Sequence, residues 1–145
     1  MIAIGCDHAG YDLKKDVIDF LNEKGFDTLD LGCSGEPVDY PEIAKNVCEK
    51  VVDGSCDKGI LICGTGIGMS IAANKIKGIR AAVCSEHFSA KYTRLHNNSN
   101  VLCMGARVIG SGIANELAEI FITTEFEGGR HQRRIDLISD IENNN

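Results

Sequence analysis

Several features are missing from this 145-residue sequence, and each absence argues against a class of protein. No apolar run approaches the roughly 20 residues that a membrane-spanning helix needs. Residues 1–5 lead into a strand-like run, with no basic leader and apolar stretch of the kind that a signal peptide has. We therefore expect a cytoplasmic protein without membrane contact, folded as a single domain over residues 1–145.

The chemistry of common metal and hydrolase sites is also missing. The chain has seven cysteines but no CxxC pair, so neither a zinc ribbon nor a thioredoxin-type site is predicted. No HxH or HExxH motif and no carboxylate cluster indicates a metal site. The GxSxG elbow of many hydrolases is absent as well. We expect no metal and no cofactor, and cysteines that remain reduced thiols.

The charge balance argues against a nucleic-acid-binding protein. The net charge is −6, which repels a phosphate backbone unless basic residues gather in one patch. Only residues 128–134 form such a patch, and it is short. We expect a small-molecule ligand and no nucleic acid.

Short apolar runs alternate with segments of helical periodicity, which is typical of a parallel α/β sheet. The pattern predicts a Rossmann-like three-layer α/β/α sandwich with a five-stranded parallel sheet and an extra C-terminal helix. The strands are expected at residues 1–6, 26–31, 59–63, 80–84 and 101–104. Helices are expected around residues 13–21 and 41–51, as a short helix from about residue 68, and around residues 85–95, 113–122 and 135–141. No strand follows the last helix, which could fold back on its own domain or lie across a second subunit.

A glycine-rich loop follows the third strand, where ligands bind in parallel sheets. Three alternating glycines from Gly64 to Gly68 allow several backbone amides to face one anion. A dinucleotide fingerprint would need glycine in place of Met69, so it is rejected. Residues 5–10 have the spacing of a nucleotide phosphate loop, but Tyr11 and Asp12 replace its lysine and hydroxyl residue. The thiol of Cys63 directly precedes the loop, and a helix N-terminus stabilises a thiolate.

Other polar residues follow or precede the predicted strands. Asp7 and His8 follow the first strand and are expected at the same sheet edge as Cys63. The run from Asp39 to Pro41 follows the second strand and is consistent with a simple turn. His96 and Asn97 precede the fifth strand, which places them at the opposite edge, where His96 could serve as an ordinary helix C-cap.

Arginines gather at the start of the last predicted helix. Cations are disfavoured at a helix N-terminus, so an anion is expected to compensate them. Arg130 and Arg134 are four residues apart, share one helical face and could bind one phosphate. Arg107, after the fifth strand, is a third candidate. A thiol base, an anion-stabilising loop, a histidine and arginines together suit proton abstraction next to a carbonyl.

These motifs resemble those of the B-type ribose-5-phosphate isomerase family, within the wider group that includes galactose-6-phosphate isomerase subunits. The matching segments are residues 5–10, 39–41, 63–68, 96–97 with 100–102, and 128–131. They cover almost the whole chain in the family's order. The resemblance implies an aldose–ketose isomerase that interconverts ribose 5-phosphate and ribulose 5-phosphate without a cofactor. It also implies a homodimer with intersubunit active sites, sometimes paired into a tetramer.

The resemblance also implies roles for individual residues. Cys63 would be the base that moves a proton between C1 and C2. Thr65 and His96 would assist opening of the furanose ring, with Asp7 near the ring oxygens. The remaining roles are backbone donors to the enediolate at Gly64, Gly66 and Gly68, phosphate contacts at His8, Arg107, Arg130 and Arg134, and sugar contacts at Tyr40 and Asn97. His96, Asn97 and Arg107 would come from the neighbouring subunit.

Two positions depart from the family pattern. One branch of the family has a glutamate base where Met69 stands, so the cysteine branch applies here. Asp often follows the His-Asn pair, whereas this chain has Asn98, which weakens any argument for a charge that orients His96. Two alternatives stay open: a six-carbon substrate such as allose or galactose 6-phosphate, and a non-catalytic module that binds sugar phosphates.

Overall fold

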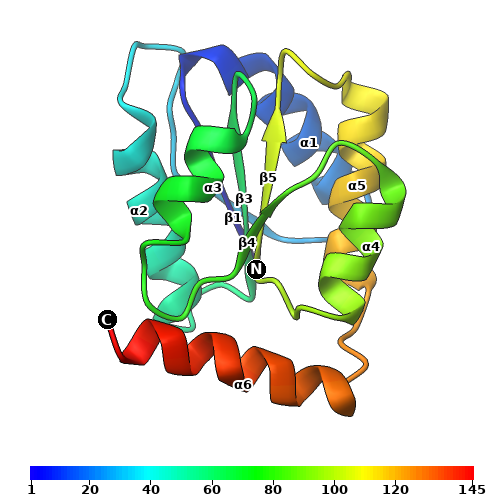
Figure 1. The fold of residues 1–145 in the computed structure, drawn as a ribbon. Coiled ribbons are helices and arrows are strands. Elements are labelled where there is room, and N and C mark those ends of the chain that lie inside the picture. Colours follow the sequence, from blue (N-terminus) through cyan, green and yellow to red (C-terminus); the bar gives the residue numbers. More distant parts are fainter.

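The computed structural model describes residues 1–145 and shows an α/β fold with one sheet (Figure 1). The strands are β1 (Ile2–Cys6), β2 (Thr28–Asp30), β3 (Lys58–Cys63), β4 (Ala81–Val83) and β5 (Val101–Gly105). The α-helices are α1 (Tyr11–Glu23), α2 (Tyr40–Val52), α3 (Ile67–Ala73), α4 (His87–Leu95), α5 (Ser111–Thr123) and α6 (Arg130–Asn143). A short 3-10 helix, η1 (His8–Gly10), links β1 to α1. No helix is long and apolar enough to span a bilayer.

All strand pairs are parallel, in the order β2-β1-β3-β5-β4. The register places Ile62 of β3 beside Cys6 of β1 on one side and Met104 of β5 on the other. Every strand therefore ends at the same edge, the upper one in Figure 1. Residues that follow strands gather at this carboxyl edge, and residues that precede strands gather at the amino edge.

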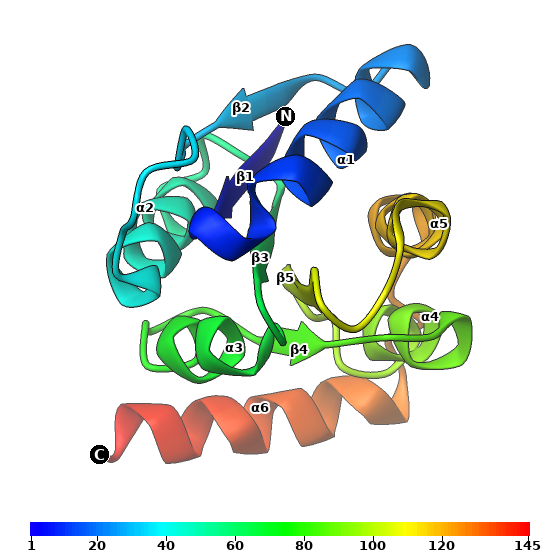
Figure 2. The same ribbon diagram turned by 90° about the horizontal axis from the view of Figure 1, so that it is seen from above.

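Helices cover both faces of the sheet, as the view from above in Figure 2 shows. One face packs against α1, α4 and α5, and the other against α2 and α3. Ile4, Ile60 and Leu102 point to the first face, while Ala3, Leu61 and Val101 point to the second. Helices exclude water from both faces, so the central strands β1, β3 and β5 are continuous apolar runs, apart from Lys58 at the start of β3.

The expected three-layer sandwich with five parallel strands is confirmed. The edge strands are shorter than the sequence pattern predicts, because β2 spans only Thr28–Asp30 and β4 only Ala81–Val83. Pro41 lies in the first turn of α2 as expected. Gly25 ends the α1 segment with a positive φ of 89°, the conformation that a glycine C-cap supplies.

Helix α6 lies across the amino edge of its own domain, below the strands in Figure 1 and on the side of edge strand β4 in Figure 2. Only His131 and Ile135 of this helix are buried. Three large apolar side chains of this helix remain exposed: Leu137, Ile138 and Ile141. The helix is therefore anchored at two buried positions, and Ile138 and Ile141 line a cavity between it and the domain.

The burial of apolar side chains predicts that two truncations to alanine differ in their effect on the free energy of unfolding. Phe121 of α5 is fully buried, whereas Val52 at the end of α2 is 52% exposed. We expect Phe121→Ala to lower the free energy of unfolding by about 3–5 kcal/mol, because it removes a large buried side chain. Val52→Ala should stay within about 0.5 kcal/mol of the native protein. Urea unfolding followed by circular dichroism measures both, and equal losses would contradict this core assignment.

Candidate active site

A cavity of about 500 Å³ opens at the carboxyl edge of the sheet. Loops after β1, β3 and β5 and the first turns of α2 and α3 contribute to it. The residues that line it are Asp7, Tyr40, Cys63, Gly64, Thr65, Ile67, Gly68, Ile71 and Arg107. Six of the residues predicted from sequence to act beside Cys63 thus lie around one cavity with it.

Cys63 is the last residue of β3 and is 5% exposed. Its Sγ accepts a hydrogen bond from the backbone N–H of Gly66 at 3.1 Å. The glycine has a φ of 81°, so the chain turns back toward the sulfur in a conformation that other residues rarely adopt. A backbone donor on a cysteine sulfur is the type of contact that stabilises a thiolate.

The glycine loop is fixed against the end of β5. The backbone N–H of Ala106 donates to the carbonyl of Cys63 at 2.8 Å, and that of Arg107 donates to the carbonyl of Gly64 at 3.0 Å. A Cβ at Gly105 would lie 2.6 Å from the carbonyl carbon of Thr65, so the two segments touch backbone to backbone. This contact holds the loop beside Cys63 in one conformation.

Asp7 and Tyr40 form two other walls of the cavity. The Oδ1 of Asp7 accepts from the N–H of Ala9 at 3.0 Å and caps η1, and Asp7 lines the cavity. The Tyr40 ring lies over the backbone of Gly68, where a Cβ would meet the ring at 2.6 Å. His8 is exposed in η1, next to Asp7 but outside the lining of the cavity.

Arg107 of the same chain lies in this cavity. The expectation that the neighbouring subunit supplies Arg107 to the site stays a prediction. Arg107 follows β5, whose end meets the end of β3 at the pair Cys63 and Gly105. Its guanidinium packs along Gly64, with Nη1 3.5 Å from the position of a Cβ there. The parallel pairing of β3 with β5 brings this cation to the carboxyl edge.

A second group of predicted site residues lies at the amino edge. His96 caps the C-terminus of α4, and Asn97 follows it in an exposed turn. Arg130 and Arg134 are exposed on the first turns of α6. The five-residue β5 alone spans about 13 Å between its end Cα atoms, so one chain keeps this group apart from Cys63.

His131 belongs to this second group, although the sequence pattern assigns it no role. Its ring stacks on that of His96, with centroids 4.1 Å apart and planes at 13°. Tyr92 and His96 form an edge-on pair, with ring centroids 5.0 Å apart. Burial lowers the pKa of His131, and the neighbouring charges of His96 and Arg130 lower it further, so this ring favours the neutral form.

His96, His131 and Glu127 also bring three possible metal ligands within 4.8 Å of one another. Zinc lies in the plane of each imidazole that binds it, about 2.0–2.1 Å from nitrogen. The two rings are nearly parallel and stacked, so their in-plane lone pairs run side by side and do not converge on one ion. The arrangement fits an aromatic stack better than a metal centre.

Most of the other thiols have a raised pKa, whereas a reactive cysteine has a lowered one. Burial raises the pKa of Cys6 and of Cys48 to about 12, and that of Cys84 to about 11. Burial also raises the pKa of Cys56 and Cys103. All seven cysteines are free thiols, consistent with the sequence-based expectation.

Residues 2–138 match the family model described as Ribose/Galactose Isomerase. Ribose-5-phosphate isomerase B of Escherichia coli is 49% identical, over 97% of this chain and 95% of that protein. D-erythrulose-4-phosphate isomerase of Pectobacterium atrosepticum is 43% identical, over 97% and 94%. The structure of Clostridium thermocellum ribose-5-phosphate isomerase B superposes with a TM-score of 0.96 at 47% identity, over 99% of this chain and 97% of that one.

The cavity predicts that Cys63 is alkylated first among the seven thiols. It combines access to the cavity with a backbone donor at sulfur, whereas burial holds most of the others in the neutral form. Iodoacetamide at neutral pH should label one site, located by peptide mass spectrometry. Cys63→Ser should remove this first label, and Cys56→Ser should leave it. First labelling at Cys84 or at several buried cysteines together would contradict the prediction.

Proposed function

The chain belongs to the Ribose/Galactose Isomerase family, and we propose that it interconverts ribose 5-phosphate and ribulose 5-phosphate. One observation supports this most directly: Cys63 Sγ lies at the cavity and accepts a hydrogen bond from the glycine loop. The non-catalytic module, by contrast, has no use for a thiol at this position. Seven unpaired cysteines favour a reducing compartment, and we place the enzyme in the cytoplasm.

The isomerisation needs a base that can reach two adjacent carbons. In the proposed reaction, the Cys63 thiolate removes the proton from C2 of the open aldose, and the electrons move onto the C1 oxygen to form an enediolate. The thiol then returns the proton to C1, while the hydroxyl proton moves from O2 to O1 and the carbonyl forms at C2. Backbone N–H groups of the loop at Gly64, Gly66 and Gly68 would stabilise the anionic oxygens.

The furanose ring must open before this proton transfer. We assign the opening to His96 and Thr65, with Asp7 beside the ring oxygens. Asp7 and Thr65 line the same cavity as Cys63, but His96 does not. The cavity of a single chain therefore holds the groups for the isomerisation step, together with Thr65, but lacks His96 for ring opening.

A two-fold dimer would bring His96 of a second subunit to the cavity. In an isologous pair, each subunit presents the same surfaces, so the carboxyl edge of one chain can meet the amino-edge residues of the other. The cavity has an apolar rim that supports this arrangement, because Ile67 and Ile71 line it and are 53% and 58% exposed. Asn97 would then contact the sugar next to the partner subunit's Tyr40. Pairing of dimers into a tetramer would leave this site unchanged.

Phosphate recognition would also draw on both subunits. His8 and Arg107 lie at the carboxyl edge, and Arg130 and Arg134 come with His96 from the amino edge of the second chain. Arginine forks match phosphate oxygens and replace their lost hydration. Base, proton donors and anion contacts are all supplied by side chains and backbone, so the proposed reaction needs no metal or cofactor.

The activity assay tests both the reaction and its base. Loss of a general base costs about 10²–10⁴-fold in rate, so Cys63→Ala should lose at least ~100-fold in kcat and keep its fold. Cys56→Ala, which removes a distant buried thiol, should remain near native. The assay contains a chelator and compares ribose 5-phosphate with allose and galactose 6-phosphates. Near-native turnover by Cys63→Ala would overturn the assignment of the base. Dependence on an added divalent ion would overturn the metal-free reaction, and preference for a six-carbon sugar would overturn the proposed substrate.

Mixed dimers test the shared site. Cys63→Ala and His96→Ala chains are unfolded together, refolded, and compared with each parent. In a hybrid, one site receives both substitutions and the other receives neither, because two-fold symmetry pairs unlike edges. Random pairing makes half of the dimers hybrids, so about one quarter of native activity should return. The residual rate of the His96→Ala parent is subtracted, and verified hybrids that never exceed the mean of their parents would exclude an intersubunit site.

A further inference from the structure

The turn that follows His96 has an unusual backbone. Asn98 has a φ of 45° and is the only residue other than glycine with a positive φ. Asparagine tolerates this left-handed conformation better than most residues. The peptide groups on both sides of it still need hydrogen-bond partners. Two guanidinium groups, those of Arg80 and Arg94, donate hydrogen bonds to this turn.

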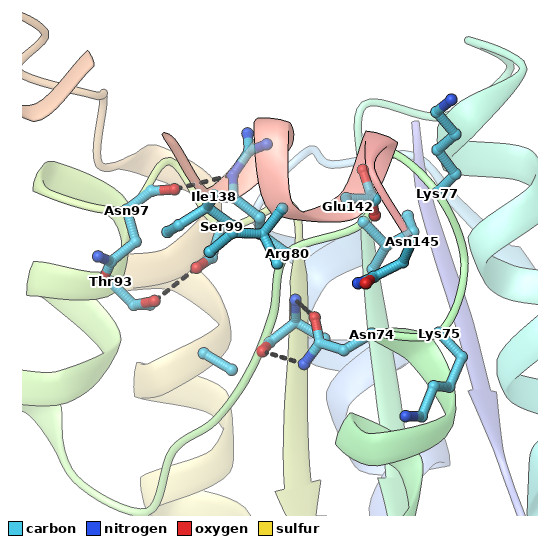
Figure 3. A pocket seen from close by; sticks show the side chains of 14 residues that line it. Asn74, Lys75, Lys77, Arg80, Thr93, Asn97, Ser99, Ile138, Glu142 and Asn145 are labelled. Carbon is cyan, nitrogen blue, oxygen red and sulfur yellow. Dashed lines mark hydrogen bonds between the residues drawn. The ribbon is translucent and has the colours of Figure 1, made fainter. Parts of the chain in front are cut away.

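Arg80 holds two consecutive carbonyl groups of the turn. Its Nε donates to the carbonyl of Asn97 at 2.9 Å, and its Nη2 donates to the carbonyl of Asn98 at 3.0 Å. Figure 3 shows the Arg80 side chain directed at Asn97 within a cavity of about 750 Å³ between α6 and the amino edge. The Arg80 backbone is fixed as well, because its N–H donates to Asn100 Oδ1 at 2.8 Å.

Arg94 holds the same turn from inside the protein. This residue is 6% exposed, and its Nη1 donates to Asn98 Oδ1 at 2.9 Å and to the carbonyl of Ser99 at 2.6 Å. The Asn98 side chain is thus occupied by Arg94 and makes no hydrogen bond to His96. Asparagine at position 98 acts on the turn rather than on the His96 ring.

Neither arginine forms an ion pair, since no carboxylate oxygen lies within 4.0 Å of either guanidinium. Burial lowers the pKa of both groups, and the like charge of Arg80 further lowers that of Arg94. Two cations without carboxylate partners on one turn are costly. Their hydrogen bonds satisfy the turn carbonyls and fix the peptide groups that follow His96.

We propose that Arg80 is a positioning residue for ring opening: it holds the Asn97 and Asn98 peptides, and thereby the His96 ring, in the orientation that the shared site needs. This inference rests on the proposed function. Arg94 cannot be separated from folding, because it is buried and also binds the carbonyl of Thr124. Arg80 is half-buried at a cavity, so water can replace its hydrogen bonds when the side chain is shortened.

The test compares Arg80→Met with a control variant in the same cavity. Lys77→Met also removes a cation that lines this cavity, but Lys77 makes no hydrogen bond to the turn. Erythrose 4-phosphate is the comparison substrate that we propose, because its O4 carries the phosphate and the sugar cannot close a furanose ring. A displacement of about 1 Å in a site can cost about 100-fold in rate. We expect Arg80→Met to lose roughly 10- to 100-fold in kcat on ribose 5-phosphate and less than about 3-fold on erythrose 4-phosphate.

Further variants separate positioning from a general structural effect. Arg80→Lys should recover part of the lost rate, because one ammonium can reach one of the two carbonyls. The loss caused by Arg80→Met should disappear in a His96→Ala background, since coupled residues are not additive. Equal losses on both substrates, or full additivity with His96→Ala, would overturn the inference.

Nuclear magnetic resonance tests the same idea without turnover. The ring protons of His96 sense the stacked His131 and the edge-on Tyr92, so their chemical shifts should move in Arg80→Met and stay in Lys77→Met. Unchanged shifts would overturn the positioning role even in an active enzyme. The native protein could instead prove inactive on ribose 5-phosphate while the His96 shifts still move in Arg80→Met. That result would overturn the proposed function and support the structural link between Arg80 and His96.

Discussion

The parallel pairing of β3 with β5 is the constraint on which the rest of the site depends. Cys63 pairs with Gly105, so whatever follows these two strands meets at one edge. The glycine loop after β3 and Arg107 after β5 therefore share a cavity. The same pairing sends everything that precedes β5, including His96, to the opposite edge. A sheet of this topology cannot unite the two groups within one chain, and the proposed dimer follows from that geometry.

The loop at Cys63 owes its shape to close backbone contact rather than to side chains. Gly66 turns the chain at a positive φ, and Gly105 admits Thr65 against the end of β5. With no side chain at either point, the N–H of Gly66 can reach the sulfur at 3.1 Å. The site thus presents an oriented donor before any substrate arrives, which is the arrangement that lowers the cost of forming an anion.

Polar groups in the interior are held by carbonyl oxygens more often than by opposite charges. Lys14 is 1% exposed and donates to the carbonyl of Cys33 at 2.6 Å as well as to Asp30. Arg80 and Arg94 bind carbonyl groups of the turn after α4 and form no ion pair. In each case a cation fixes a loop next to a strand end. The buried cations therefore shape the two edges of the sheet, where the chemistry lies.

The amino-acid pattern by itself determined the α/β class, the strand order along the chain, and the glycine loop after β3, because apolar periodicity and glycine spacing are local properties. It also determined that Cys63 and His96 lie at opposite edges, since both flank strands of one parallel sheet. Tertiary structure alone decided which side chains meet. Arg107 joined Cys63, His131 stacked on His96, and Arg80 bound the turn at Asn98. These contacts join segments separated by about 20 to 40 residues, and their geometry depends on how helices pack on the sheet, which no local pattern records.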